Sequence, residues 1–514
     1  MIRAQAPVTT LDSSRCATCT AAGDTADNPI GHYLQSLNST GENLSPRWHH
    51  EAMASRMTDT EALMWSVEQN PQLRSTMGAI AILDGVPDPE RLRATIIKAL
   101  PSVPALRERV QPSGVPLVPP ERVLDQNLDL DHHIRVVRLP PSSGIAALEA
   151  LACAIINDPF DRDRPLWQMT IVSGLPRRRC GLVMKLHHSI ADGQGALGLA
   201  MHLLEFQADA PEPEQQSIAA VLDALAAASP RDPNPASLAD SLRFGAERIA
   251  GFLNEAAGAL ANPQRAAEAG AAAKHLADQL PSSDPAGGSP LWKRRSGNRR
   301  LATYALPLDA LKRAAAERDV RINELFVVAC AEAALAQHQR AGVAIHELNT
   351  SVVVSTRADD DPAGTNSFVP VAVTLPADGA AADHRIEALR AQIQLKRDEV
   401  ETTADAIGAF GAVANLLPAS LAASFALQQT RRLDFATSNL PGPAIAMWIA
   451  GKRIQSLRPV GPLGGTAFNA TLLSFGTEAA VGLHVDPATG IESAELRRDL
   501  RSGLATLGVT GLPR

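Results

Sequence analysis

The stretch KLHHSIADGQG, from Lys185 to Gly195, holds the residues whose types could do chemistry. His187 and His188 are adjacent, and Asp192 and Gly193 follow them at a fixed offset. A neutral imidazole beside a cleft can take a proton from a hydroxyl near physiological pH, so a histidine here could act as a general base. Asp192 could orient an imidazole, or it could hold the loop through an arginine.

Three alternatives compete with a general base. A serine hydrolase would need a G-x-S-x-G elbow, which the sequence lacks. A metal site could use His188 and Asp192, but no third ligand is evident, so no metal is expected. The last alternative is a pair of hydrogen-bonded core histidines, and the chain has two further His-His pairs for comparison, His49-His50 and His132-His133. Spacing alone leaves the catalytic and the structural role both open.

The elements around the histidines favour a functional site. Residues 180–186, CGLVMKL, are nearly continuously apolar, as a buried strand should be, and the histidines fall at its end. Residues 191–206 read as the next helix. Gly193 and Gly195 stand at its start, and without side chains they let a ligand or a second backbone approach closely.

The rest of the chain alternates between strand and helix patterns. Strands are expected at 77–83, 133–139, 166–175, 299–308, 348–357 and 367–376, a strand ending in a turn at 434–443, a hairpin at 466–486, and helices between them. We therefore expect two α/β halves, with four segments in all: a disordered extension (1–52), an N-terminal lobe (53–207), an Ala- and Pro-rich helical connector (208–290) and a C-terminal lobe (291–514).

Composition narrows the function classes. The formal charge of −7, from 48 basic and 55 acidic residues, provides no broad basic field for nucleic acid. Five cysteines are too few for a disulfide scaffold and indicate a reducing compartment; Cys16-x-x-Cys19 lacks a second ligand pair for zinc. No apolar run is long enough to span a membrane, so a cytoplasmic protein is expected, with contact to a membrane surface left open.

Five blocks, in this order along the chain, resemble the bacterial wax ester synthase/diacylglycerol acyltransferase family. HHxxxDG at 187–193 is the signature of the wider CoA-dependent acyltransferase superfamily. The other four narrow the match: Pro165-Leu166-Trp167, Arg321 to Glu324, Thr350 to Arg357 with Asn366, and Ser438 to Pro443. Glu324 stands where the family has Asp, and Thr365 precedes Asn366 where the family has Gly. The resemblance covers about residues 57 to 510.

The resemblance implies a fold and a set of roles. The fold would be α/β of the α+β type, with two chloramphenicol-acetyltransferase-like lobes that each hold a mixed sheet with helices. His188 would be the general base beside His187. Asp192 would orient the loop, with Arg357 as its partner.

The remaining blocks are expected to bind substrate or to shape the site. Gly193, Asn323 and Asn439 are carried over as substrate-binding positions. Pro165, Leu166, Trp167 and Arg357 are carried over as structural. Each secondary block could also have a purely structural role: Pro165 and Trp167 could begin and pack an edge strand, Asn323 could cap a helix, and the 438–443 block could be only a rigid turn.

The implied reaction is acyl transfer from acyl-CoA, a co-substrate, to an alcohol, with no cofactor. Family substrates are diacylglycerol or a long-chain alcohol, so peripheral contact with a membrane or lipid droplet is implied. Two alternatives stay open. One is a condensation-type acyltransferase that uses carrier-bound donors, and the other is a non-catalytic protein that binds acyl-CoA or lipid droplets.

Overall fold

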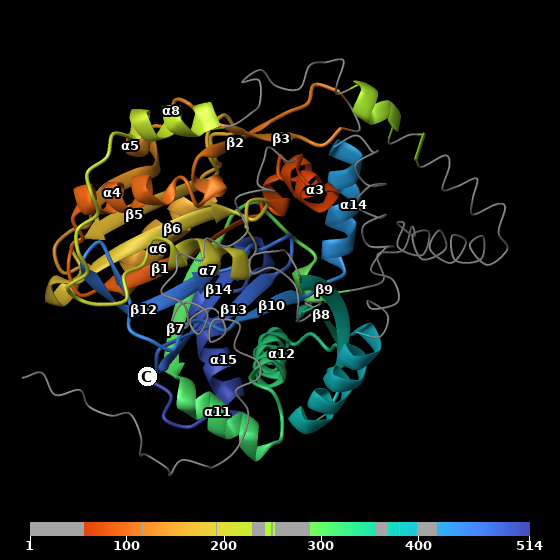
Figure 1. The fold of residues 1–514 in the computed structure, drawn as a ribbon. Coiled ribbons are helices and arrows are strands. Elements are labelled where there is room, and N and C mark those ends of the chain that lie inside the picture. The colour runs from red at the N-terminus through yellow and green to blue at the C-terminus, as the bar shows by residue number, and fades with distance from the viewer. Residues whose placement is uncertain are drawn as a thin grey trace, which may run out of the picture. The chain divides into compact units, whose positions relative to one another are not determined.

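Two six-stranded mixed sheets form the framework of the part of the chain that the structure describes (Figure 1). This computed structural model describes residues 56–115, 118–191, 193–228, 242–247, 250–251, 288–355, 368–379, 381–397 and 419–513. All of them fall within one compact unit, residues 45–514. The predicted fold class, two lobes that each hold a mixed sheet with helices, is confirmed.

The first sheet has the order β11-β12-β1-β6-β5-β4. Only the β4–β5 pair in it is parallel; the other neighbours are antiparallel. The strands are β11 (Trp448–Ile449), β12 (Lys452–Val460), β1 (Thr76–Leu83), β6 (Cys180–His187), β5 (Trp167–Ser173) and β4 (Ile134–Arg138).

The second sheet has the order β7-β14-β13-β10-β8-β9. β10 pairs in parallel with both β13 and β8, and the remaining pairs are antiparallel. The strands are β7 (Arg300–Pro307), β14 (Glu478–Val485), β13 (Phe468–Phe475), β10 (Phe435–Leu440), β8 (Glu347–Ser355) and β9 (Phe368–Pro376). The predicted hairpin at 466–486 is thus confirmed as β13–β14.

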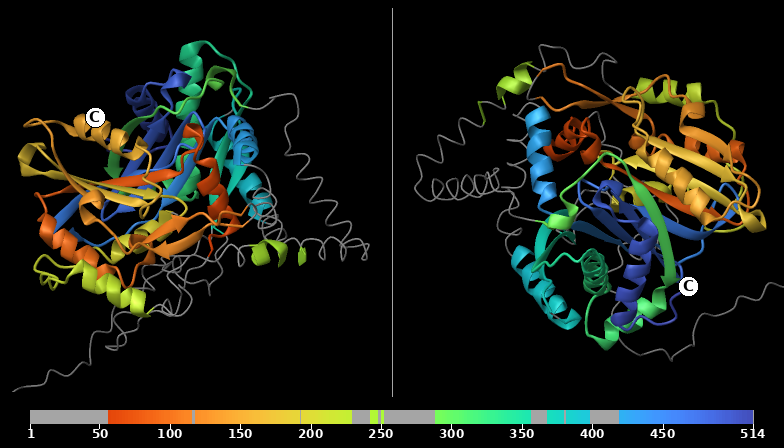
Figure 2. Two further views of the ribbon diagram at one scale, coloured as in Figure 1. Left: turned by 90° about the horizontal axis from the view of Figure 1, so that it is seen from above. Right: turned by 180° about the vertical axis from the view of Figure 1, so that it is seen from behind.

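Helices cover these sheets, and a short ribbon of β2 (Glu108–Gln111) and β3 (Glu121–Leu124) stands apart from them. Figures 1 and 2 show α4 and α8 on the side of the first lobe, and α11, α12 and α15 beside the second sheet. The helices are α3 (Asp59–Val67), α4 (Pro89–Ala99), α5 (Leu130–His133), α6 (Ile145–Asn157), α7 (Gly193–Met201), α8 (Ile218–Ala228), α11 (Leu308–Glu317), α12 (Ile322–Ala341), α14 (Ala419–Arg431) and α15 (Ser493–Thr506), with a further helical segment at 382–397.

Strand β1 shows how alternation builds the first lobe. Successive side chains of a strand point to opposite faces. Ala81 and Leu83 join a core under α4, whereas Ile80 and Ile82 join a second core under α6. The first sheet is therefore covered on both faces, which explains why β1 and β6 are apolar almost throughout.

Helix α12 is the central helix of the second lobe. Residues Leu325 to Ala331 are all buried, so this helix is apolar around its whole circumference rather than along one stripe. It packs against the second sheet and against α15. Gly342 ends it in a left-handed conformation with φ of 67°, where glycine carries no Cβ penalty.

Strands β11 and β12 connect the two lobes in a way that sequence order does not suggest. They lie within the range 291–514 predicted as the C-terminal lobe, yet β12 pairs with β1 of the first sheet, with Gly78 opposite Val460. β12 also lies against β14, where a Cβ on Gly482 would overlap the carbonyl oxygen of Pro459. The predicted domain limits stay a prediction, but this segment crosses them.

Helix α3 is a second link, because it packs against α14 from the far end of the sequence. Val67 and Leu73 share a small core with Ala422 and Ala423. The two helices stand side by side in Figure 1. The sequence pattern alone does not predict this helix, although Thr58 and Glu61 form a complete capping box at its start.

Several predictions fall on residues that the structure does not describe. The extension 1–52, with Cys16, Cys19 and His49-His50, lies outside the described residues, as does most of the connector. The described connector parts 218–228 and 242–247 are helical, as predicted. Cys153, Cys180 and Cys330 are buried free thiols. Within the described ranges, no helix combines the length and apolarity needed to cross a bilayer.

Candidate active site

The two histidines lie where the central strand β6 ends. His187 is its last residue, and His188 begins a turn; we call residues 187–190 the histidine turn. The neighbouring strands fix its backbone. The His187 N–H donates to Leu166 O at 3.1 Å, and the His188 N–H donates to Ser75 O at 2.9 Å. The prediction that the pair sits at a buried strand end is confirmed.

His187 is fully buried, and its hydrogen bonds assign its tautomer. Nδ1 lies 3.0 Å from the backbone N–H of Ser189, which donates to it, and 2.6 Å from the Ser189 hydroxyl. Nδ1 is therefore an acceptor, and the ring proton lies on Nε2, which contacts Glu68 Oε2. Burial lowers the pKa of His187 to about 3, with a smaller effect from His188, so the imidazole is neutral.

His188 differs from its neighbour in exposure. Its side chain is half-buried, neither sealed in the core nor fully open to solvent. A general base needs this intermediate position, because it must reach an incoming hydroxyl while keeping bulk water away. Its catalytic role stays a prediction.

Glu68, the C-cap residue of α3, brings a buried carboxyl group to the histidine turn. Burial raises the pKa of Glu68 to about 7, although the positive charges of Arg162, Arg74 and Lys185 lower it in part. Its side chain is 13% exposed.

Lys185 is the cation nearest in sequence to the histidines, two residues before His187 on β6. It is almost completely buried, its Nζ donates to Asp158 O at 2.6 Å, and it lies 4.1 Å from the centre of the Phe160 ring. Burial lowers the pKa of Lys185 to about 8. The region behind the turn is thus a buried cluster of opposite charges, which sequence reasoning missed.

Two sequence signals could have found that cluster. The capping box at Thr58 and Glu61 marks the helix that carries Glu68. Lys185 is a charge in an otherwise apolar strand, and buried charges in proteins are paired. Their meeting depends on strand order, which the sequence pattern does not provide.

The 165–167 block begins strand β5, and Pro165, Leu166 and Trp167 are all buried. The Trp167 Nε1–H donates to Leu106 O at 3.0 Å, and its ring stacks on His133 with centroids 4.3 Å apart. The suggestion of an edge strand is wrong, because β5 lies between β6 and β4. The block builds the lobe core rather than a free edge.

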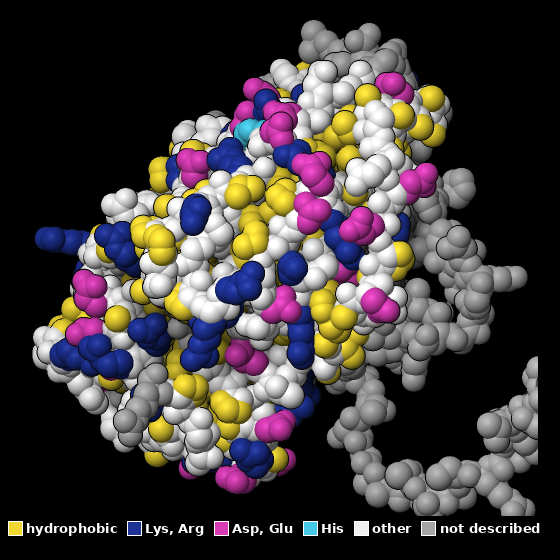
Figure 3. Space-filling view, turned by 90° about the vertical axis from the view of Figure 1, so that its left-hand side faces the viewer, with side chains coloured by type: hydrophobic (Ala, Val, Ile, Leu, Met, Phe, Trp, Pro, Cys, Tyr) yellow, Lys and Arg dark blue, Asp and Glu magenta, His cyan; other side chains and the backbone are white. Residues whose placement is uncertain are grey.

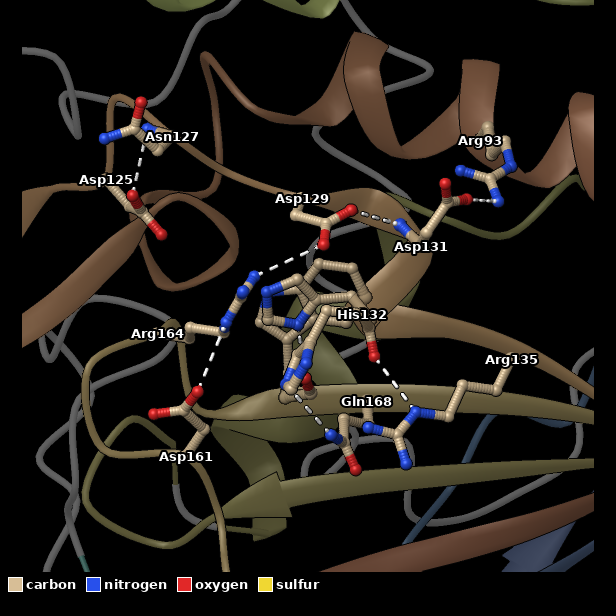
Figure 4. A network of polar contacts seen from close by, with 12 residues as sticks. Arg93, Asp125, Asn127, Asp129, Asp131, His132, Arg135, Asp161, Arg164 and Gln168 are labelled. Atoms are coloured by element: carbon tan, nitrogen blue, oxygen red, sulfur yellow. Dashed lines mark hydrogen bonds and ion pairs between the residues drawn. The ribbon is translucent and has the colours of Figure 1, made fainter.

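Arg164 forms ion pairs that fix the loop before the 165–167 block. It contacts Asp129 at 3.4 Å and Asp161 at 3.2 Å, as Figure 4 shows. The same view shows His132 beside Gln168, with their Nε2 atoms 3.3 Å apart. The side chains of Arg164 and its two carboxylate partners are all at least one-third exposed, so these ion pairs fasten a surface loop.

Asn323 does not cap its helix, and that part of the prediction is wrong. The N-cap of α12 is Arg321, whose backbone N–H donates a hydrogen bond to the Glu324 carboxylate at 3.0 Å. Asn323 lies one residue inside the helix and is half-buried. It lines a hollow of about 720 Å³ with Arg321, Glu324 and Arg390. His188 does not line this hollow, so the structure does not bring these two predicted site residues together there.

The 438–443 block ends strand β10: its first three residues belong to the strand, and residues 441–443 follow it. The Gly442 N–H donates to Ser474 Oγ at 3.1 Å, and the Gly476 N–H donates to Pro443 O at 2.9 Å. A Cβ on Gly442 would overlap the carbonyl oxygen of Ser474. Asn439, half-buried, lies opposite Leu472 of β13. The block is therefore not a turn throughout, because its first three residues belong to β10, and substrate binding by Asn439 stays a prediction.

The remaining predicted residues are described only in part. Gly193 is the first residue of α7, in line with its expected place at a helix start. Asp192, Thr356, Arg357 and Asn366 lie outside the described residues, so the proposed Asp192–Arg357 pair stays a prediction.

This fold, with a histidine turn at the end of a central strand and two mixed sheets joined through β12, is that of the two-lobed acyltransferases. Residues 51–326 match the wax ester synthase/diacylglycerol acyltransferase catalytic domain, and residues 365–508 match the C-terminal domain of the same family. The chain belongs to this family, and it is an O-acyltransferase.

Individual relatives agree with this assignment. Two proteins of Mycobacterium tuberculosis named as putative diacylglycerol O-acyltransferases are 28% identical over 453 residues and 27% identical over 482 residues. The first match covers 85% of this chain and 88% of the relative, and the second covers 89% and 90%.

Solved structures show the same fold. The wax ester synthase/diacylglycerol acyltransferase of Marinobacter aquaeolei VT8 has a TM-score of 0.56 at 21% identity, covering 88% of this chain and 98% of that one. The first condensation domain of the CDA synthetase has a TM-score of 0.51 at 16% identity, covering 90% and 99%.

Proposed function

We propose that this protein transfers a fatty acyl group from acyl-CoA to the hydroxyl of diacylglycerol, with His188 as the general base. The observation that carries this proposal is the half-buried His188 on a tightly held turn at the end of β6, in a chain of this family. The names of the mycobacterial relatives support diacylglycerol as the acceptor.

In the proposed reaction His188 transfers one proton in two steps, first from the acceptor hydroxyl to its ring and then from its ring to the CoA thiolate. The hydroxyl oxygen attacks the thioester carbonyl carbon while His188 accepts the hydroxyl proton, and a tetrahedral oxyanion forms. The C–S bond then breaks, and the CoA thiolate takes the proton from the imidazolium. No acyl-enzyme is needed, because both substrates are held together and the attack is direct.

A long-chain alcohol is the second candidate acceptor. The family carries both activities in its name, and a primary alcohol presents the same nucleophile as diacylglycerol. The two acceptors differ in bulk beside the hydroxyl, so the shape of the acceptor channel would decide between them.

Peripheral contact with a lipid surface is part of the proposal, because both acceptors are lipids. Val136 is 61% exposed on the edge strand β4, between the exposed Arg135 and Arg138. One face of the molecule carries Lys and Arg side chains with acidic and apolar ones between them (Figure 3). The exposed Arg135 and Arg138 beside Val136 suit the interface of an anionic lipid layer. Co-sedimentation with vesicles containing phosphatidylserine tests this; equal sedimentation with neutral vesicles would contradict the electrostatic part.

The test of the reaction is a competition assay with purified full-length protein. Palmitoyl-CoA is supplied with equal amounts of dipalmitoylglycerol and hexadecanol, and lipid products and free CoA are both measured. Triacylglycerol in excess over wax ester, with one CoA per ester, is the expected result. Formation of wax ester alone would mean that the acceptor is the long-chain alcohol and not diacylglycerol. Binding of palmitoyl-CoA without CoA release would contradict the enzymatic proposal, and turnover only with carrier-bound donors would favour the condensation-type alternative.

A further inference from the structure

Glu68 reaches the buried histidine of the histidine turn. It contacts the Nε2 atom of His187 directly through Oε2. The backbone N–H of His188 is held separately, by the carbonyl oxygen of Ser75 at 2.9 Å. The carboxyl group of Glu68 therefore holds the ring of His187, the residue directly before His188 in the turn.

Hydrogen bonds of His187 connect its ring and backbone to the rest of the histidine turn. Its Nδ1 accepts the Ser189 N–H at 3.0 Å, and its carbonyl oxygen accepts the Ile190 N–H at 3.1 Å. Because Nε2 carries the ring proton, the contact with the Glu68 carboxyl group limits ring rotation from the opposite side. A second contact from the same end of the chain supports the turn, since Arg122 donates to Ser189 O and pairs with Glu61 of α3 at 2.7 Å.

The charges that face Glu68 come from three different segments. Arg162 precedes β5 and lies 3.5 Å from the centre of the Trp65 ring, Arg74 follows the 3₁₀ turn Pro71–Leu73, and Lys185 is on β6. Burial nevertheless places the pKa of Glu68 at about 7, in the range where an acyltransferase is assayed. Its neighbour His187 stays neutral throughout that range, because burial holds its pKa at about 3.

We propose that Glu68 is a positioning residue for the reaction, which fixes the His188 imidazole through the neighbouring His187 and does so best as a carboxylate. An N–H bond to a charged acceptor is stronger than one to a neutral acceptor. Protonation of Glu68 therefore loosens the turn without unfolding it. This inference rests on the proposed role of His188 as the base.

The variant Glu68→Gln separates charge from shape, because a glutamine keeps an oxygen acceptor for Nε2–H and does not titrate. The readout is the ratio of wild-type to variant kcat, measured from pH 6 to pH 8. We expect this ratio to rise by about fivefold to tenfold between those limits, as the acceptor in the wild type gains its charge. A ratio that is constant with pH would overturn the proposal.

Glu205 provides a matched control. It is buried to a similar degree, with a side chain 11% exposed, and it pairs with Arg91 at 2.8 Å. It also accepts the Gly451 N–H at 3.0 Å, but none of these contacts involves the histidine turn. The Glu205→Gln variant should show a pH-independent kcat ratio to the wild type. A pH-dependent ratio in this control would assign the effect to loss of any buried carboxylate and would overturn the specific role of Glu68.

A second variant decides the matter if Glu68→Gln does not fold. Arg74→Gln removes a positive charge that lowers the pKa of Glu68, so the pH midpoint of kcat should move upward. An unmoved midpoint would contradict the proposal. Where the double variant with Glu68→Gln folds, the shift should vanish in it, and persistence of the shift would also count against Glu68.

The His188→Ala variant separates the proposed role of His188 from the proposed role of Glu68. If that variant keeps its rate, the proposed base is wrong and the inference about Glu68 falls with it. If His188→Ala is inactive and the Glu68→Gln ratio is flat, only the inference about Glu68 is overturned.

Discussion

Two His-His pairs in the described chain look alike in the sequence and differ in their surroundings. In each pair one ring is fully buried and the other is half-buried: His133 beside His132, and His187 beside His188. Both buried rings are neutral, since burial lowers the pKa of His133 to about 4 and that of His187 to about 3.

The difference lies in what the buried ring touches. His133 stacks on Trp167, and its Nδ1 lies 2.7 Å from the Trp167 carbonyl oxygen, so both partners are uncharged. His187 contacts the carboxyl group of Glu68 and lies beside buried cations. A buried histidine pair is therefore not by itself a sign of catalysis. The ionisable group behind the buried ring distinguishes the two sites, and the following predictions test that distinction.

The largest expected effect is on stability at the first pair. Trp167→Ala removes a fully buried ring that stacks on His133 and donates to Leu106 O, so we expect a loss of about 3–5 kcal/mol in the free energy of unfolding. Urea denaturation measures it. A loss below about 1 kcal/mol would mean that the site relaxes around the missing ring and that the stack is not the main role of this pair.

His133 is expected to make one contribution to the pH dependence of stability, which a variant can isolate. Its folded pKa of about 4 lies below the ordinary value of 6.5, so the unfolded chain binds more protons between these values. The contribution is present above pH 6.5 and is lost as pH falls toward 4, a difference of about 2.5 pKa units or roughly 3 kcal/mol. His133→Phe lacks this titration, and its stability should vary less with acid than that of the wild type. Equal slopes in the two proteins would contradict the assignment.

Activity should separate the two buried rings. His187→Ala removes the buried ring whose contacts support the histidine turn. We expect kcat to fall by about 10²-fold, because a displacement of a catalytic group by about 1 Å has an effect of that size. His133→Ala should lower the melting temperature and keep the wild-type kcat, because its contacts are with the lobe core. The assay temperature must lie below both melting transitions. Equal losses of kcat in the two variants would erase the proposed difference.

The smallest expected effect concerns Ser189. Ser189→Ala removes the hydroxyl that lies 2.6 Å from His187 Nδ1 but leaves the backbone N–H donor at 3.0 Å. We expect a loss of about 1 kcal/mol in the free energy of unfolding, typical of one hydrogen bond, and only a small change in kcat. A large loss of kcat with normal stability would place the hydroxyl itself in the chemistry.

Most local elements can be predicted from the sequence, because alternation and helical periodicity are local. The strands β1, β6 and β13–β14 and the helices α4 and α12 lie where the patterns indicate. The histidine turn falls at the end of a buried strand, as predicted, for the same reason. The helical character of α12 is also clear from the pattern, although its cap is Arg321 rather than Asn323.

The parts that escape prediction depend on contacts between distant segments. β12 joins the first sheet through pairing with β1, which lies near the other end of the chain, and no local pattern records that choice. Glu68 meets His187 because α3 and the end of β6 lie together in the fold. A carboxylate in a polar stretch of sequence looks like a surface residue until the fold buries it.

The most direct measurement of the central claim is the turnover of His188→Ala with palmitoyl-CoA and dipalmitoylglycerol, followed by CoA release. A general base typically contributes about 10²–10⁴ in rate, so kcat should fall by that factor while the unfolding midpoint stays at the wild-type value. A folded His188→Ala protein that keeps near wild-type turnover would contradict the account.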